Sequence, residues 1–359
     1  KHNKEQQIIT FINKTDYMKR PNIHNKYMMT AFGCLLAALC IIYYYFFSSM
    51  SVDSDTHYIY IDNDDTADSV YTKLSSVSNS QAITGFKTLA SLSSYGSNIR
   101  SGCYEINGSN GALSVFRKLK NGLQTPVRLT IPSVRTVERL AGSISKKMMT
   151  DSITLLKAMT DTATCRKYGY TPETIVCMFI PNTYDIYWNA SVDNIMERME
   201  KESNSFWNSE RTGKAASMEL SRNQVITLAS IVDEETSNNA EKPMIAGMYY
   251  NRLKKDMPLQ ADPTIKFALK QFGLKRIYNN MLHTDSPYNT YKNTGLPPGP
   301  IRIPSVEGID AVLNHANHDY LYMCAKEDFS GTHNFAVTYA EHLQNARKYT
   351  EALNRRGIK

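Results

Sequence analysis

Cysteine is scarce in this sequence, and its spacing argues against two classes of site. The chain has six cysteines in 359 residues, with no CxxC pair and no regular spacing. A cysteine-bound zinc site and a thioredoxin-like redox centre are therefore not expected. Two cysteines lie in an apolar run, and for the other four both disulfides and buried free thiols fit the pattern. These four are Cys103, Cys165, Cys177 and Cys324.

Histidine motifs for metal binding are also missing. His315 and His318 are three residues apart, and His333 and His342 follow, but there is no HExxH arrangement and no nearby cysteine ligand. Histidines in such a pattern are more often ordinary helix and turn residues than zinc ligands. We therefore expect no metal and no cofactor.

The folded part of the chain lacks a cluster of basic residues. The formal net charge is +7, but the first 27 residues contribute +4 of it, from six Lys and Arg against two acidic residues. The remainder is only mildly basic, so we expect no nucleic-acid partner. A content of 42% hydrophobic and 21% charged residues, without repeats or long low-complexity segments, is typical of a folded protein.

One long apolar run does occur. Residues 28–47 contain no charge, and 20 residues are about the length that a helix needs to cross a ~30 Å hydrocarbon layer. We interpret the run as a single transmembrane helix rather than a cleaved signal peptide or a buried core helix. The basic tail at residues 1–27 and the acidic stretch after the run place the amino terminus in the cytoplasm and the rest outside the cytoplasmic membrane.

Beyond a polar linker at residues 48–56, short apolar strands alternate with helical patterns. Residues 57–132 predict a small α+β module that ends with the strand VRLTIP. Residues 133–359 predict a larger, mostly helical α+β domain. In that domain SRNQ and Pro243 mark the starts of two helices.

A candidate catalytic carboxylate lies on the first of these helices. Leu228, Ile231, Val232 and Glu235 are spaced so that the carboxylate continues an apolar stripe, whereas Glu234 falls on the opposite, polar face and Asp233 on the flank. Apolar surroundings raise the pKa of a carboxyl group, as a general acid at neutral pH requires. The alternative is a solvated carboxylate at a helix end without a chemical role.

Three later segments are poor in helix and strand signals but rich in binding groups. They are LQADPT, SPYNTY and GLPPGPI, and loops of this kind commonly line clefts. Aromatic faces and amide side chains in and around them could contact sugar rings, hydroxyls and acetamido groups. The residues concerned are Trp188, Gln260, Tyr288, Asn289, Tyr291 and Asn314.

With these segments the sequence resembles the endolytic murein transglycosylases, also called the YceG-like family. The resemblance is carried by LASIVDEET, AGMYYNRL, LQADPT, SPYNTY, GLPPGPI, LNHANHDYLY and HNFAVTYAEH, which span residues 228–342, and by FIPNTYDIYW upstream. It implies that residues 57–132 are a LysM-like module and that residues 133–359 are the transglycosylase domain. The expected activity is cleavage between N-acetylmuramic acid and N-acetylglucosamine within peptidoglycan glycan strands, leaving 1,6-anhydro ends.

The resemblance also assigns roles to single residues. It places the catalytic glutamate at Glu235, the second acidic member of the family's E-x-E-T pattern. The first member is Asp233 here, a departure from the pattern in a supporting position. Cleft residues for substrate are expected at Gln260, Asp262, Tyr288, Asn289 and Asn314. The partners implied are glycan strands, the cytoplasmic membrane and the peptidoglycan synthases.

Two other functions stay open at this point. A membrane-anchored scaffold that binds peptidoglycan without cutting it is suggested by the substitution at Asp233. A conventional hydrolase would cut the same bond with water and leave a reducing end, heavier than the anhydro end by one water.

Overall fold

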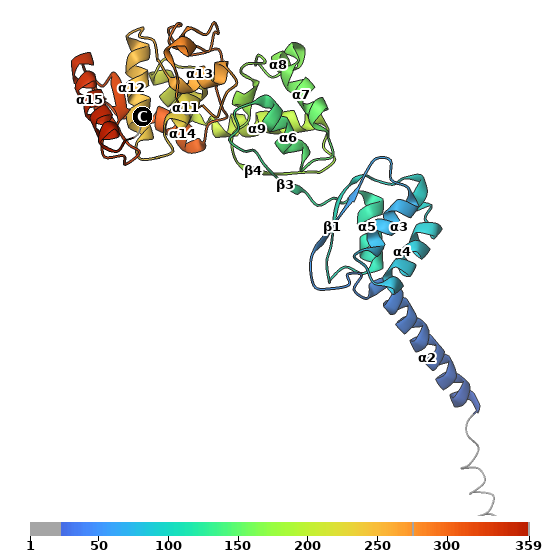
Figure 1. Ribbon diagram of the computed structural model, residues 1–359. Coiled ribbons are helices and arrows are strands. Elements are labelled where there is room, and N and C mark those ends of the chain that lie inside the picture. Colours follow the sequence, from blue (N-terminus) through green and yellow to red (C-terminus); the bar gives the residue numbers. More distant parts are fainter. Residues whose placement is uncertain (1–22, 275, 358–359) are drawn as a thin grey trace, which may run out of the picture. The chain divides into compact units, whose positions relative to one another are not determined.

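The structure is a computed structural model that describes residues 23–274 and 276–357 (Figure 1). Its contacts divide the chain into two compact units, one that ends at Thr125 and one that begins at Pro126. The predicted cytoplasmic tail lies almost entirely outside the described residues. Both units combine helices with antiparallel strand pairs, which confirms the prediction of an α+β protein.

The first unit begins with a long apolar helix. Helix α2 (Ile23–Ile42) continues directly into η1 (Tyr43–Phe47), a single π-helical stretch. Together they supply one candidate membrane span, Lys26–Phe47, with 22 residues and a mean hydropathy of 1.9. No residue of its most apolar stretch is buried inside the protein, so this helix suggests a membrane anchor rather than a core helix.

The rest of this unit is a small α+β fold. Strands β1 and β2 pair antiparallel, with Ile59 opposite Tyr104. The helices pack on them around an aromatic core, in which the rings of Tyr95 and Phe116 meet that of Phe86 edge to face at 5.9 and 5.8 Å. The elements are β1 (His57–Ile61), α3 (Ala67–Ser75), α4 (Ser80–Leu92), η2 (Tyr95–Ser97), β2 (Gly102–Ile106) and α5 (Ala112–Asn121).

The predicted polar linker at residues 48–56 is not a free linker at its start. Met50 is fully buried, its backbone N–H donates to Asn110 O at 2.7 Å, and its carbonyl accepts from the N–H of Asn79 at 2.8 Å. Ser51 is buried as well. Polarity indicated a linker here, but these polar groups are satisfied by hydrogen bonds within the module.

The boundary between the two units also differs from the prediction. Strand β3 (Val127–Thr130), expected to close the first module near Pro132, pairs antiparallel with β4 (Thr183–Ile186) of the second unit. A strand's partner cannot be determined from its own sequence pattern. That pattern alone assigns β3 to the first module, whereas its pairing puts it in the second unit. The helices of this part are α6 (Val137–Ser145), α7 (Ser152–Thr160), α8 (Thr162–Lys167), η3 (Ile175–Met178), α9 (Val192–Phe206) and α10 (Ser209–Ser217).

Helix α11 (Arg222–Glu235) is the central element of the second unit. It packs against α12 (Lys242–Lys254), α13 (Asp262–Ala268) and α14 (Val306–Leu313), and its residues 225–232 are all buried. The predicted helix starts are confirmed, since Ser221 and Gln224 form a capping box and Pro243 lies in the first turn of α12.

The polar face of α11 is buried too, which the sequence pattern did not indicate. Thr227 and Ser230 are 3% and 0% exposed, and Ser230 Oγ accepts a hydrogen bond from the N–H of Ile301 at 3.0 Å. The end of the GLPPGPI segment therefore covers this face. The remaining elements are η4 (Asn279–His283), β5 (Tyr322–Ala325), β6 (His333–Ala336) and α15 (Tyr339–Arg355), with β5 and β6 paired antiparallel.

Candidate active site

The carboxyl end of α11 opens onto a cavity of about 300 Å³ within the second unit. Its walls come from α12, from the segment that leads into α13, and from the hairpin of β5 and β6. The lining residues include Glu235, Tyr249, Arg252, Gln260, Asp262, Tyr291, Cys324 and His333. The structure thus brings together four residues that the sequence pointed to, Glu235, Gln260, Asp262 and Tyr291.

Glu235, the last residue of α11, has the strongly perturbed carboxyl group of the cavity. Burial raises its pKa from the ordinary 4.5 to about 7. The hydroxyl of Tyr249 donates to Glu235 Oε1 at 2.7 Å and opposes this rise, as do the positive charges of His333 and Lys266, while the charge of Asp262 adds to it. Near neutral pH the group therefore exists in both protonation states, as an acid that later acts as a base must.

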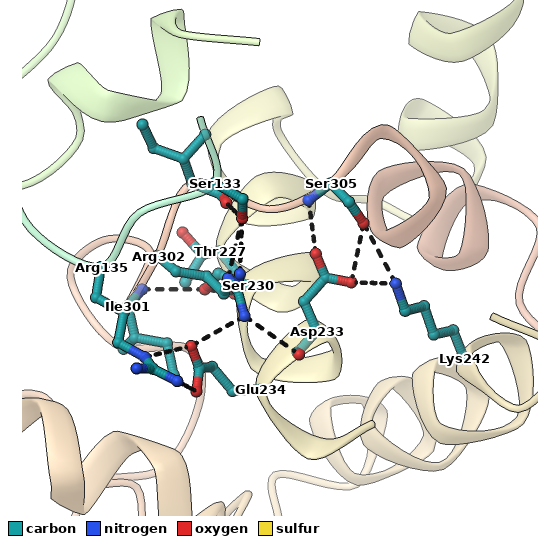
Figure 2. Close-up of polar contacts among 11 residues, drawn as sticks. Ser133, Arg135, Thr227, Ser230, Asp233, Glu234, Lys242, Ile301, Arg302 and Ser305 are labelled. Carbon is teal, nitrogen blue, oxygen red and sulfur yellow. Dashed lines mark hydrogen bonds and ion pairs between the residues drawn. The ribbon is translucent and has the colours of Figure 1, made fainter. Parts of the chain in front are cut away.

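The two preceding carboxylates lie in different surroundings (Figure 2). Asp233 Oδ1 forms an ion pair with Lys242 at 2.7 Å, and both side chains are almost fully buried. Asp233 Oδ2 accepts from the backbone N–H of Ser305 at 2.6 Å, and Ser305 caps α14 through the N–H of Gly308. Asp233 therefore connects the ends of α11, α12 and α14.

Glu234 is held on the other side of the helix end (Figure 2). It accepts two hydrogen bonds from Arg135, at 2.7 and 2.9 Å, and one from Arg302 at 3.1 Å. Arg302 also donates to Ser133 Oγ at 2.8 Å. Of three consecutive acidic residues, two are thus bound to cations, and Glu235 has no ion-pair partner among the described residues.

Arg252 holds another part of the cavity wall together. This buried guanidinium donates to the backbone carbonyls of Leu259 and Leu321 at 2.8 and 2.6 Å, and so joins the segment before α13 to the segment before β5. Gln260, which follows Leu259 in the chain, has a φ of 51°, a left-handed conformation that is uncommon for a residue other than glycine. Asp262 accepts a hydrogen bond from the hydroxyl of Tyr291 at 2.6 Å.

His333 contributes a ring to the same cavity. The buried carboxylate of Glu241 accepts from its backbone N–H at 2.7 Å and contacts its ring Nδ1 at 3.0 Å. This pair fixes the orientation of the ring and leaves Nε2 without a partner among the described residues. Roles for Tyr249, Arg252 and His333 were not predicted, although AGMYYNRL and HNFAVTYAEH contain them, because contacts between distant segments cannot be derived from spacing.

Three residues predicted to bind substrate lie elsewhere. Tyr288 packs on Phe267 at a ring distance of 4.7 Å and lines a different cavity. Asn289 is fully buried, and its amide binds the backbone at Leu282, Thr284 and Tyr291. Asn314 is exposed and accepts from Lys214 at 2.8 Å. These contacts correct the predicted placement: Asn289 shapes a loop, and none of the three lines the Glu235 cavity.

Three other histidines of the second unit contact neighbouring residues. His315 packs on Tyr250, His318 contacts the carbonyl of Met244 at 3.0 Å, and His342 stacks on Tyr322. In the described part of the chain no three His, Cys, Asp or Glu residues are grouped to hold a metal. All six cysteines are free thiols in the structure, and Cys324 lines the cavity.

Fold and site together define an α+β protein with an apolar amino-terminal helix and, at the end of a buried helix, a carboxyl group that has no ion-pair partner among the described residues. Residues 59–348 match the model of the YceG-like family, and the chain belongs to this family. The match covers both units.

Two curated relatives are similar to this chain. The chain is 38% identical over 166 residues to the endolytic murein transglycosylase of Bacillus subtilis (strain 168), which covers 46% of this chain and 45% of that protein. It is 26% identical over 288 residues to the endolytic murein transglycosylase of Streptococcus pneumoniae serotype 2 (strain D39 / NCTC 7466), which covers 71% of this chain and 51% of that protein. The chain therefore spans about half the length of these curated relatives.

A solved structure is similar to this chain as well. The crystal structure of the yceG-like protein lmo1499 from Listeria monocytogenes aligns with a TM-score of 0.54 at 28% sequence identity. The alignment covers 81% of this chain and 99% of that one.

Proposed function

We propose that this chain is an endolytic lytic transglycosylase. It cleaves the bond between N-acetylmuramic acid and N-acetylglucosamine within peptidoglycan glycan strands and leaves 1,6-anhydro ends. The observation that carries the proposal is Glu235, a carboxyl group with a pKa of about 7, in a cavity, without an ion-pair partner among the described residues. Membership of the YceG-like family and the names of the relatives support it.

In the first step Glu235 is the general acid. Its proton passes to the glycosidic oxygen, the bond to the muramyl anomeric carbon breaks, and N-acetylglucosamine leaves as an alcohol. Glu235 Oε1 accepts the hydrogen bond from Tyr249, whereas Glu235 Oε2 has no hydrogen-bond partner in the described part of the chain. Oε2 is therefore the oxygen that faces the substrate. Burial of the carboxyl group favours its protonated form, which this step requires.

In the second step the Glu235 carboxylate is the base. It accepts the proton of the muramyl 6-hydroxyl while that oxygen bonds to the anomeric carbon, and the carboxyl group is restored. A nucleophile within the same sugar is already close to the reacting carbon, so one carboxylate is sufficient. Gln260, Asp262 and His333 line the same cavity and are proposed to contact the sugar hydroxyl and acetamido groups.

A conventional hydrolase is the second candidate, because Asp262 supplies another carboxylate to the same cavity. The contact with Tyr291 disfavours it, since that hydroxyl stabilises Asp262 in place rather than leaving it free to attack. The scaffold hypothesis is weakened by Asp233, whose short side chain still makes an ion pair with Lys242 and binds Ser305, the N-cap residue of α14.

Mass spectrometry of the products tests the proposal. Purified glycan strands are incubated with the full chain in detergent and, in parallel, with Glu235→Gln. Anhydro ends from the first protein and none from the second are expected. Reducing ends instead would support the hydrolase, and binding without cleavage by both proteins would support the scaffold.

The setting of this activity is also proposed. The apolar helix anchors the chain in the cytoplasmic membrane with its amino terminus inside, which the basic residues before the span support. The first unit, two helices between two antiparallel strands followed by a third helix, is proposed to be a LysM-like module. Peptidoglycan synthases are the proposed protein partners of the reaction, because they supply new strands.

A further inference from the structure

The carboxyl end of the apolar helix packs directly on α4 and α5 of the same unit. Gly85 of α4 lies against the carbonyl of Tyr45, with no room for a side chain. A Cβ at Gly111 would lie 2.8 Å from Phe46 O and 2.9 Å from Phe47 O. These two glycines let α4 and α5 contact the backbone of the helix end directly. The adjoining surface of the unit must therefore lie where the helix leaves the membrane.

A cavity of about 440 Å³ opens at this junction. Its volume is within the usual range for small-molecule sites. One wall is the aromatic end of the span, and the other is α5 with its flanking residues. The lining residues are Phe46, Phe47, Ser109, Gly111, Leu113, Ser114, Arg117, Lys118 and Leu123.

The charge of this cavity has one sign. Arg117 and Lys118 line it, and no acidic residue does. Lys118 donates to two neutral acceptors, Glu105 O and Asn110 Oδ1, both at 3.1 Å, so its charge is not neutralised by them. Arg117 is exposed and forms no ion pair among the described residues. The apolar side chains beside them, above all Leu123 at 60% exposure, are open to solvent.

A cavity that combines exposed apolar side chains with cations suits the surface of a membrane. An exposed leucine and two phenylalanines favour the boundary of the acyl chains, while the two cations of α5, which form no ion pair among the described residues, favour a phosphate. We propose that this cavity binds the headgroup of an anionic phospholipid, with the phosphate at Arg117 and Lys118 and the glycerol against Leu113, Leu123 and the aromatic end of the span. The proposal rests on the membrane anchor proposed above, which puts this end of the span at the outer leaflet, and it is independent of the catalytic activity.

Competitive lipid retention tests the site. The full chain is reconstituted in vesicles of equal parts phosphatidylglycerol and phosphatidylcholine, extracted in mild detergent, and examined by native mass spectrometry. One retained phosphatidylglycerol per chain is expected, in preference to phosphatidylcholine. Arg117→Gln should reduce that preference about fivefold, which is the effect of one basic contact near an anionic surface.

Two further variants make the result specific. Leu123→Ser, at an exposed position, should weaken retention of both lipids. Lys87→Gln removes an exposed lysine of the same unit that does not line the cavity, and it should leave retention unchanged.

Several outcomes would overturn the site. They are equal retention of the two lipids by the unmodified chain, an unchanged preference in Arg117→Gln, or an equal loss in Lys87→Gln. Displacement of the lipid by millimolar inorganic phosphate would reassign the cavity to a soluble anion. A chain that alkaline carbonate strips from the vesicles would refute the anchor and the lipid site together. Glycan cleavage is measured separately, so these failures are distinguishable from failure of the proposed activity.

Discussion

The raised pKa of Glu235 should have a measurable cost in stability. In the unfolded chain this carboxyl group titrates near 4.5, whereas in the folded protein it titrates at about 7. Between these values the folded state holds the proton more tightly, so the stability that Glu235 contributes is present below pH 4.5 and is lost as the pH rises through 7. Glu235→Gln has no such titration, and the variant should keep this stability at high pH.

The size of the effect follows from the two pKa values. Each tenfold change in proton affinity corresponds to about 1.4 kcal/mol, which gives a limit of about 3 kcal/mol for a change from 4.5 to about 7. Glu235 is partly open to the cavity, so we expect about 2 kcal/mol after solvent screening. The free energy of unfolding of Glu235→Gln minus that of the parent should therefore be about 2 kcal/mol larger at pH 8 than at pH 4.

Urea denaturation at both pH values measures this difference. The two tryptophans, Trp188 and Trp207, both lie in the second unit, so their fluorescence reports the unfolding of that unit. Glu210→Gln is a matched control at an exposed surface pair, where the pKa is lowered by Lys214, and it should not reproduce the gain at pH 8. If the parent and Glu235→Gln changed in parallel with pH, the reasoning about burial would be refuted.

Three other substitutions test the remaining contacts. Tyr249→Phe removes the hydrogen-bond donor to Glu235, and turnover should fall roughly tenfold. Because that hydrogen bond lowers the pKa of Glu235, the alkaline limb of the pH–rate profile should shift to higher pH by up to about one pH unit. An unchanged profile would exclude a role for the hydroxyl. Asp262→Asn removes a like charge, so the alkaline limb should move to lower pH while anhydro products persist; complete loss of cleavage would favour the hydrolase. Lys242→Ala leaves the buried Asp233 unpaired, and urea denaturation should show a loss of about 3–5 kcal/mol; a loss below about 1 kcal/mol would mean that the pair does not hold the helix ends.

Local patterns were sufficient to predict the elements around the site. The spacing of Leu228, Ile231, Val232 and Glu235 placed the carboxylate at the end of an apolar stripe, and the first three are fully buried. The start of α11 at a capping box was readable because the box involves residues only three positions apart. These predictions rest on contacts within one helix.

Predictions that depended on distant contacts were less successful. Polarity suggested a loop residue in contact with sugar at Asn289, but its amide is used to hold the backbone of its own turn. Strand β3 looked like the end of the first module because its partner, β4, lies more than fifty residues further along the chain. Tyr249 is brought to Glu235 only by the packing of α12 on α11.

In the proposed mechanism a single carboxyl group, Glu235, is sufficient for closure of the anhydro ring, and no water takes part. Digestion of glycan strands in heavy-oxygen water, followed by mass analysis of the new muramyl ends, tests this mechanism. We predict ends that carry no heavy oxygen and are lighter than a hydrolysed end by one water. New ends that each carry one heavy oxygen would show that water attacks the anomeric carbon, and would contradict the single-carboxylate mechanism.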